Sequence, residues 1–225
     1  MMRDYTKQVW NKVSKMNISH DFILGPINAE SLLKDPKHLA FTLSRYKFSA
    51  KMLHNCKHII ELGCGEGIGV LSFLKETNAS ITAIDFDQRQ IEYARANLLP
   101  FVHDRVKFIC SDMISEPYKG KKADGLACID VIEHIHSSEE KRFFNHCFSL
   151  LEKDGVAIFG TPNKFAEKYA SPRSKKGHIN LFTPERFYST LSNHFKHVFL
   201  FSMNDELVHT GFYKMAHYLL ALCIK

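Results

Sequence analysis

The sequence predicts a single α/β domain whose doubly wound, mostly parallel sheet of seven strands is covered by helices on both faces. From residue 58 onward, short apolar runs alternate with stretches of helical periodicity. Such alternation is typical of parallel strands joined by crossover helices. A chain of 225 residues is long enough for one full core and too short for two comfortable ones.

The first fifty residues precede this alternation. Val9, Trp10, Val13 and Met16 predict an amphipathic helix within residues 1–18. Residues 19–26 read as a loop, and residues 36–53 read as a second helix. We expect residues 1–50 to form a helical cap over the carboxyl ends of the strands, where open α/β sheets bind ligands, and residues 51–225 to form the main domain.

The elements of the main domain follow in order. Predicted strands occupy residues 58–62, 81–84, 106–110, 125–129, 156–159, 197–203 and 212–224, the last two as an antiparallel hairpin at the C-terminus. Predicted helices occupy residues 68–77, 88–98 and 137–151, and a fourth begins at Thr183-Pro184. Ser137 with Glu140 resembles a capping box, and Thr183 with Pro184 combines an N-cap with a proline at the first helical position.

Composition excludes several classes of protein. Hydrophobic residues make up 45% and charged residues 24% of the chain, as in globular domains. We find no apolar run of about 20 residues and no signal peptide. Six scattered cysteines without a C-x-x-C pair predict reduced thiols and a cytoplasmic protein. The net charge of +6, with a local cluster at Lys164, Lys168, Arg173, Lys175 and Lys176, is compatible with an anionic substrate, with RNA or with a solvated loop.

A glycine-rich loop follows the first strand. Gly63, Gly65 and Gly67 let the backbone turn sharply and let a ligand approach closely. Asp85 ends the second strand, where an acid accepts hydrogen bonds from both hydroxyls of a ribose. The pair predicts a cofactor that contains adenosine. The spacing is G-x-G-x-G, unlike the G-x-G-x-x-G of dinucleotide enzymes, and Glu61 suits a cofactor with an ammonium and a sulfonium better than a pyrophosphate.

This loop resembles the first motif of the class I S-adenosylmethionine-dependent methyltransferases, E/D-x-G-x-G-x-G, and the resemblance covers about residues 40–205. It implies a Rossmann-like fold with S-adenosylmethionine as cofactor. It also implies that Asp85 binds the ribose and that Ile84 and Phe86 flank the adenine. The remaining implied cofactor contacts are Asp112 with Met113 at the adenine amino group, Ile129 at the methionine part, and Arg45 at the cofactor carboxylate.

An acid–histidine cluster follows the fourth strand. If the segment curls into a helical turn, Asp130, Glu133 and His134 share one face. The segment is similar to the E-x-x-E-H of quinone-biosynthesis O-methyltransferases, and to that of small-RNA 3′-terminal methyltransferases, which add a later histidine. Here Asp130 replaces the first glutamate, and His178 is the later histidine. The resemblance implies a divalent metal, for which mixed N/O ligands favour Mn²⁺, Fe²⁺ or Zn²⁺ over Mg²⁺. The alternatives are a metal-free catalytic base, His134 or His178, and a structural role.

Several functions therefore stay open. The favoured one is methyl transfer to a hydroxyl of a small-molecule acceptor, with the N-terminal cap enclosing that acceptor. A second is 2′-O-methylation of an RNA 3′-terminal ribose, although no dense basic stripe marks an RNA surface. A non-catalytic S-adenosylmethionine-binding protein and a nicotinamide dehydrogenase are the others.

Overall fold

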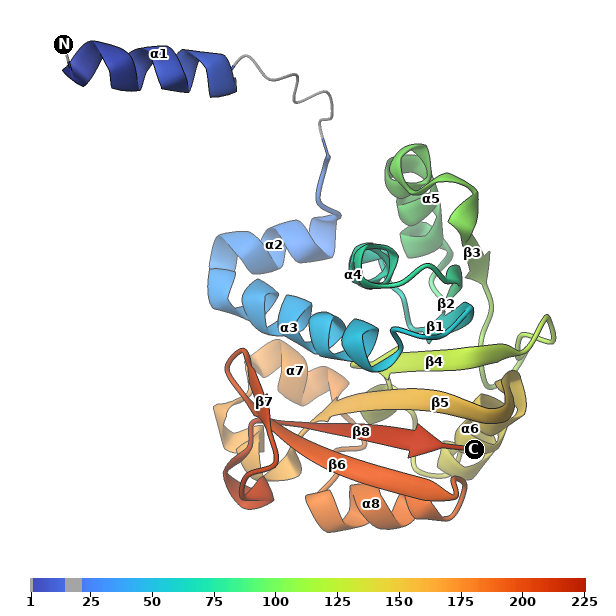
Figure 1. The fold of residues 1–225 in the computed structure, drawn as a ribbon. Coiled ribbons are helices and arrows are strands. Elements are labelled where there is room, and N and C mark those ends of the chain that lie inside the picture. Colours follow the sequence, from blue (N-terminus) through green and yellow to red (C-terminus); the bar gives the residue numbers. More distant parts are fainter. Residues whose placement is uncertain (1, 15–21) are drawn as a thin grey trace.

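The computed structural model describes residues 2–14 and 22–225, in which one mixed sheet of eight strands is flanked by helices (Figure 1). The strands are β1 (His58–Leu62), β2 (Ser80–Asp85), β3 (Val106–Cys110), β4 (Ala123–Ile129), β5 (Leu151–Pro162), β6 (His197–Asn204), β7 (Leu207–His209) and β8 (Tyr218–Ile224). The α-helices are α1 (Met2–Ser14), α2 (Pro26–Lys34), α3 (Pro36–Met52), α4 (Ile68–Glu76), α5 (Gln88–Val102), α6 (Glu140–Leu150), α7 (Pro172–Gly177) and α8 (Pro184–Ser192). Short 3-10 helices are η1 (His103–Arg105), η2 (Ile132–His134), η3 (Lys164–Tyr169) and η4 (Tyr213–Met215).

The sheet has the order β3-β2-β1-β4-β5-β8-β6-β7. Strands β1 to β5 are parallel, and β8, β6 and β7 continue the sheet with antiparallel pairs. The predicted α/β fold is therefore confirmed, although an additional short strand, β7, raises the predicted seven strands to eight. The winding direction reverses between β1 and β4, which is the switch point where such sheets bind ligands.

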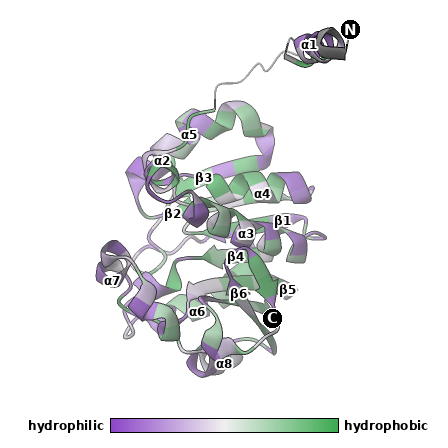
Figure 2. Ribbon diagram, turned by 90° about the vertical axis from the view of Figure 1, so that its left-hand side faces the viewer, coloured by the Kyte–Doolittle hydropathy of each residue, from purple (hydrophilic) through white to green (hydrophobic). Residues whose placement is uncertain are grey.

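Both faces of the sheet are buried because the strands are apolar at successive positions. Ile59 packs with Tyr46 of α3 and Phe73 of α4 on one face. Ile60, the next residue of β1, packs with Phe143 of α6 on the other face. The central strands are correspondingly green, and α7 is largely purple, in the hydropathy view (Figure 2). The helices thus fix the edge where the carboxyl ends of β1, β2 and β4 meet.

The N-terminal helices differ in how they join this body. α3 packs against α4 and buries Tyr46 and Ala50. α1 stands apart from the rest of the ribbon in Figure 1, and Trp10 is 67% exposed. Met16 and residues 19–21 of the predicted loop lie outside the described residues, residues 22–25 form neither helix nor strand, and Pro26 begins α2. α2 was not expected from the sequence, and a cap made of residues 1–50 stays a prediction.

Two predicted helix starts have different outcomes. The Thr183 side chain accepts a hydrogen bond from the Arg186 backbone N–H at 3.2 Å, so the N-cap of α8 is confirmed. The capping box at Ser137 is wrong, because α6 begins at Glu140 after a turn. The Glu140 carboxylate instead accepts hydrogen bonds from Asn180 and Arg186.

Among the described residues, no helix is long and apolar enough to cross a bilayer.

Candidate active site

The glycine loop joins β1 to α4 in a conformation that glycine alone adopts without strain. Gly63, Gly65 and Gly67 have φ angles of +75°, +53° and +83°. A Cβ at Gly67 would lie 2.5 Å from Leu98 Cδ1. The backbone N–H groups of Gly63 and Cys64 both donate to the Ile84 carbonyl, at 2.8 and 3.0 Å. The loop is thereby fastened to the end of β2.

Asp85 lies directly beside this loop and is 5% exposed. Its Oδ2 accepts a hydrogen bond from the Gly65 N–H at 2.8 Å, and its Oδ1 accepts one from the Asp87 N–H at 2.9 Å. Phe86, the next residue, is 70% exposed. The structure thus brings the predicted ribose acid, the glycine loop and an uncovered aromatic ring to one place.

Glu61 lies beneath the loop, away from solvent. The side chain is 1% exposed, and a Cβ at Gly69 would lie 2.4 Å from its Oε1. Neither carboxylate oxygen has a well-formed hydrogen bond to a described residue. Burial raises the pKa of Glu61 to about 8, an effect that the nearby Tyr46 hydroxyl reduces and Asp85 increases. Glu61 is therefore a buried carboxyl next to the glycine loop, and its contact with the cofactor stays a prediction.

The other predicted cofactor contacts are more scattered. Asp112 is exposed, and its carboxylate accepts bonds from the Ile114 N–H at 2.8 Å and the Ser115 hydroxyl at 2.7 Å, which lowers its pKa. Met113 and Ile129 are 5% and 3% exposed and belong to the core on opposite faces of the sheet. Asp112 therefore closes its own turn.

The acid–histidine segment forms the helical turn that its spacing requires, as η2. Candidate ligand atoms of Glu133, His134 and His178 all lie within 4.8 Å of one another. The two imidazole rings meet edge to face with centroids 5.1 Å apart. His134 Nδ1 is 2.9 Å from the Gly177 carbonyl, which fixes the ring orientation and leaves Nε2 available.

Glu133 is fully buried in this group. Its Oε2 accepts a hydrogen bond from the Thr161 hydroxyl at 3.1 Å, whereas Oε1 has no partner among the described residues. Burial, reinforced by the charge of Asp130, raises the pKa of Glu133 to about 8. Burial and the neighbouring His134 lower the pKa of His178. An orphaned carboxylate oxygen beside two imidazoles is a donor set that fits a divalent metal.

Asp130 does not join this group, contrary to the four-residue set that the sequence indicates. Its Oδ2 accepts a hydrogen bond from Arg45 Nη1 of α3 at 2.7 Å. The Arg45 guanidinium also lies 3.9 Å from the centre of the Tyr218 ring. Arg45, the predicted holder of the cofactor carboxylate, is thus paired with Asp130 and is 12% exposed.

The two halves of the site touch each other. A Cβ at Gly63 would lie 2.2 Å from Val131 Cγ2, so the glycine loop abuts the segment between Asp130 and η2. Both lie at the carboxyl edge of the parallel strands. A ligand on the glycine loop would therefore have its neighbour in the acid–histidine group.

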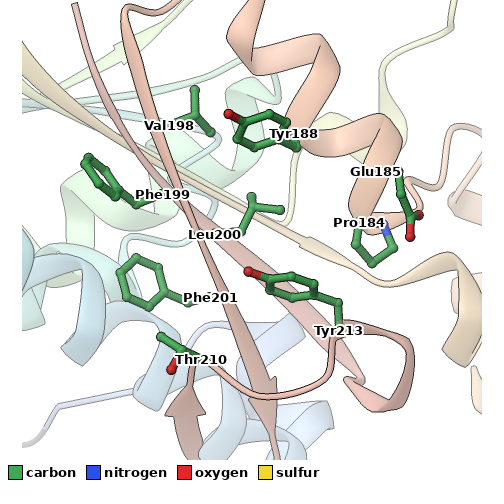
Figure 3. Close-up of a pocket in the computed structure, with 9 residues that line it drawn as sticks. All are labelled: Pro184, Glu185, Tyr188, Val198, Phe199, Leu200, Phe201, Thr210 and Tyr213. Atoms are coloured by element: carbon green, nitrogen blue, oxygen red, sulfur yellow. The ribbon is translucent and has the colours of Figure 1, made fainter.

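An apolar hollow of about 590 Å³ lies elsewhere, between α8 and β6 (Figure 3). Tyr188, Leu200 and Tyr213 are among the residues that line it. No predicted site residue is among them. We therefore place the site by its chemistry, at the switch point, and not at this hollow.

Sequence analysis missed some residues of the site. Thr161 and Tyr218 hold Glu133 and Arg45 in place but stand in ordinary strand sequence, without a motif. Glu66, inside the glycine loop, is 7% exposed and bonds to α2. Its position between two glycines was the only available signal.

Known proteins match this arrangement. A family profile described as a methyltransferase domain matches residues 59–155. The chain is 27% identical over 164 residues to a ubiquinone biosynthesis O-methyltransferase of Rickettsia canadensis, covering 71% of this chain and 60% of that protein. It is 26% identical over 116 residues to a probable S-adenosylmethionine-dependent methyltransferase of Mycolicibacterium smegmatis, covering 51% and 42%. The chain thus spans about half the length of these curated relatives.

Solved structures share the fold. The methyltransferase domain of bacterial CtHen1-C superposes with a TM-score of 0.66 at 20% identity, covering 82% of this chain and 98% of that one. The plantazolicin methyltransferase BpumL in complex with SAH gives 0.64 at 16% identity, covering 88% and 93%.

The matched profile shows a methyltransferase domain in residues 59–155, and the fold and the glycine loop are similar to those of the class I S-adenosylmethionine-dependent methyltransferases. Within that class, the relatives just described include O-methyltransferases of ubiquinone biosynthesis.

Proposed function

We propose that this protein transfers the methyl group of S-adenosylmethionine to a hydroxyl of a small-molecule acceptor. The observation that carries the proposal is the contact between Gly63 and Val131, which puts the glycine loop next to the acid–histidine group. Methyl transfer from a sulfonium needs a donor and an acceptor oxygen held in line, and proximity of this kind is worth about 7–11 kcal/mol in favourable systems.

The cofactor would occupy the edge of β1 and β2. Asp85 would accept hydrogen bonds from the ribose hydroxyls, and the exposed ring of Phe86 would pack on the adenine. Backbone of the loop from Gly63 to Gly67 would approach the methionine part. Arg45 would have to exchange Asp130 for the cofactor carboxylate, and Asp112 would have to open its turn to reach the adenine amino group.

The acceptor would enter on the side of the histidines. Its hydroxyl loses a proton as its oxygen forms the bond to the methyl carbon, and the C–S bonding pair returns to sulfur. Without a metal, His178 would accept that proton through a ring nitrogen, and the Gly177 carbonyl holds His134 beside it. Alternatively, Glu133, His134 and His178 would hold a divalent metal, which when bound supplies positive charge that lowers the pKa of an acceptor hydroxyl.

A second candidate is the 2′-hydroxyl of an RNA 3′-terminal ribose. It is favoured by His178, the later histidine of the small-RNA pattern, which lies beside Glu133 and His134. The basic residues of α7, Arg173, Lys175 and Lys176, adjoin this histidine in the chain.

The test is the variant His178→Ala, compared with His197→Ala, which removes an exposed histidine of β6. We expect His178→Ala to lose methyl transfer from isotopically labelled cofactor, measured with hydroxylated aromatic acids and with an RNA oligonucleotide as acceptors. Its affinity for S-adenosylhomocysteine, measured by calorimetry, should stay within about twofold of the wild type because we assign His178 to the acceptor side and not to the cofactor loop. Full activity of His178→Ala would remove the acceptor-side assignment.

The metal has a separate test. Titration of the chelator-treated protein with Mn²⁺, followed by electron paramagnetic resonance, should show one site in the wild type and in His197→Ala, and weakened binding in His178→Ala. Equal binding by His178→Ala would exclude this metal site. Binding of NAD without binding of S-adenosylhomocysteine would overturn the proposed function altogether.

A further inference from the structure

Helix α2 is attached to the protein without a buried face. None of its residues, Pro26 to Lys34, is buried, and Leu33 is 85% exposed. Its N-cap residue is Gly25, which has no side chain to bond the free N–H groups of the first turn, and the first turn carries no acid. A helix end of this kind needs acceptors from elsewhere.

Glu66 supplies those acceptors from the glycine loop. Its Oε1 accepts a hydrogen bond from the Ile27 N–H at 2.7 Å. Its Oε2 accepts bonds from the Asn28 N–H at 3.1 Å and from Asn28 Nδ2 at 2.7 Å. A negative charge at a helix N-terminus also interacts favourably with the helix dipole. The absence of a side chain at residue 25 is needed here, because a Cβ would lie 2.1 Å from Glu66 Cδ.

The same loop segment belongs to the proposed cofactor site. Glu66 stands between Gly65 and Gly67, which both have positive φ. The Gly65 N–H donates to Asp85, the predicted ribose acid, one residue before the side chain that caps α2. A shift of this loop would therefore change the hydrogen bonds at both the Asp85 carboxylate and the N-terminus of α2.

The far part of α2 reaches the acceptor side. Glu30 Oε2 pairs with Arg173 Nη1 of α7 at 3.2 Å. The carbonyl of Gly177, the last residue of α7, bonds to His134. α2 therefore connects the cofactor loop with the helix that supports the histidine pair.

We propose that Glu66 is a positioning residue that docks α2 on the glycine loop, so that cofactor binding and the docking of α2 stabilise each other. This rests on the proposed function only in taking the glycine loop as the S-adenosylmethionine site. By linkage, a cofactor that orders the loop must strengthen the cap, and the cap must in turn tighten cofactor binding.

Hydrogen exchange of the full chain, with and without S-adenosylhomocysteine, tests this coupling. In the wild type the ligand should slow exchange of the α2 amides by about tenfold, the order of effect of one helix cap. In Glu66→Ala these amides should exchange fast with or without ligand, and calorimetry should show that the ligand binds about tenfold more weakly. Glu66→Gln, which keeps an oxygen acceptor, should restore part of both effects. Glu92→Ala, which removes an exposed glutamate of α5, should behave as the wild type.

The outcomes separate the two proposals. If the wild type binds S-adenosylhomocysteine but its α2 exchange is unchanged, or if Glu66→Ala keeps the ligand-dependent protection, the coupling is refuted and the proposed function stands. If the wild type does not bind the ligand, both are refuted. Should Glu66→Ala fail to fold by near-ultraviolet circular dichroism, Glu66→Gln decides, because loss of the charge alone should still weaken ligand binding by about severalfold. An unchanged ligand affinity in Glu66→Gln would then refute the coupling.

Discussion

Glu61→Gln should flatten the pH dependence of stability. The folded-state pKa of Glu61 is about 8, against an ordinary value of 4.5, because the carboxyl is buried and Asp85 lies near it, while the Tyr46 hydroxyl offsets part of this rise. The folded protein therefore holds this proton more tightly than the unfolded chain does. Stability from this group is complete below pH 4.5 and is lost as the pH rises toward 8. Each pKa unit corresponds to ~1.4 kcal/mol, so the free energy of unfolding should fall by about 3 kcal/mol from pH 5 to 7.5.

Urea unfolding at several pH values measures this loss. The pKa of Glu133 is also raised, so the wild-type curve of stability against pH contains a contribution from Glu133. The difference between the wild type and Glu61→Gln isolates the contribution of Glu61. Normalised to pH 5, Glu61→Gln should exceed the wild type by about 3 kcal/mol at pH 7.5. Glu92→Gln, at an exposed position of α5, should follow the wild type. Parallel curves for wild type and Glu61→Gln would refute the assignment of a proton to this buried carboxyl.

Two further predictions concern packing at the switch point. Gly63→Ala should cost about 2–4 kcal/mol in urea unfolding and abolish S-adenosylhomocysteine binding, because its φ is +75° and the new Cβ would meet Val131 at 2.2 Å. Gly120→Ala would also meet a side chain, Tyr118, but its backbone is not left-handed, so it should cost less; equal effects of both would contradict the backbone strain at Gly63. Arg45→Met and Asp130→Asn should each lower the free energy of unfolding by about 2 kcal/mol, since each change leaves a partly buried partner unpaired. The double variant should lose clearly less than the sum of the two, and strict additivity would show that the pair is not coupled.

The parallel part of the fold could be predicted because its signals are local. β1 and β3 match the predicted residues 58–62 and 106–110, since each is an apolar run of strand length between turns. The glycine loop could be predicted for the same reason, because its conformation depends on residues that are neighbours in the chain. α2 was missed because its cap comes from Glu66, distant in sequence, and because it has no buried stripe to reveal a helical period.

Only part of the candidate site could be predicted from the sequence. The helical turn of Glu133 and His134 and the approach of His178 follow from spacing and from the position of the predicted strands. The hydrogen-bond partners do not: folding brings Thr161 to Glu133 and Arg45 to Asp130 from distant segments of the chain. The failure of the Ser137 capping box has a similar cause, because Glu140 bonds to Arg186 and Asn180 across the fold.

The departure from the E-x-x-E-H pattern at Asp130 has a structural reason in this chain. Asp130 adopts φ +58°, a left-handed conformation that aspartate tolerates better than most residues with longer side chains. Its backbone N–H bonds to the Gly160 carbonyl at 3.1 Å, so the chain leaves β4 and turns immediately into η2. That turn carries Glu133 into the core beside Thr161, while the short Asp130 side chain meets Arg45. Asp130 therefore shapes the turn that presents the acid–histidine group, and the ligand atoms come from the residues that follow it.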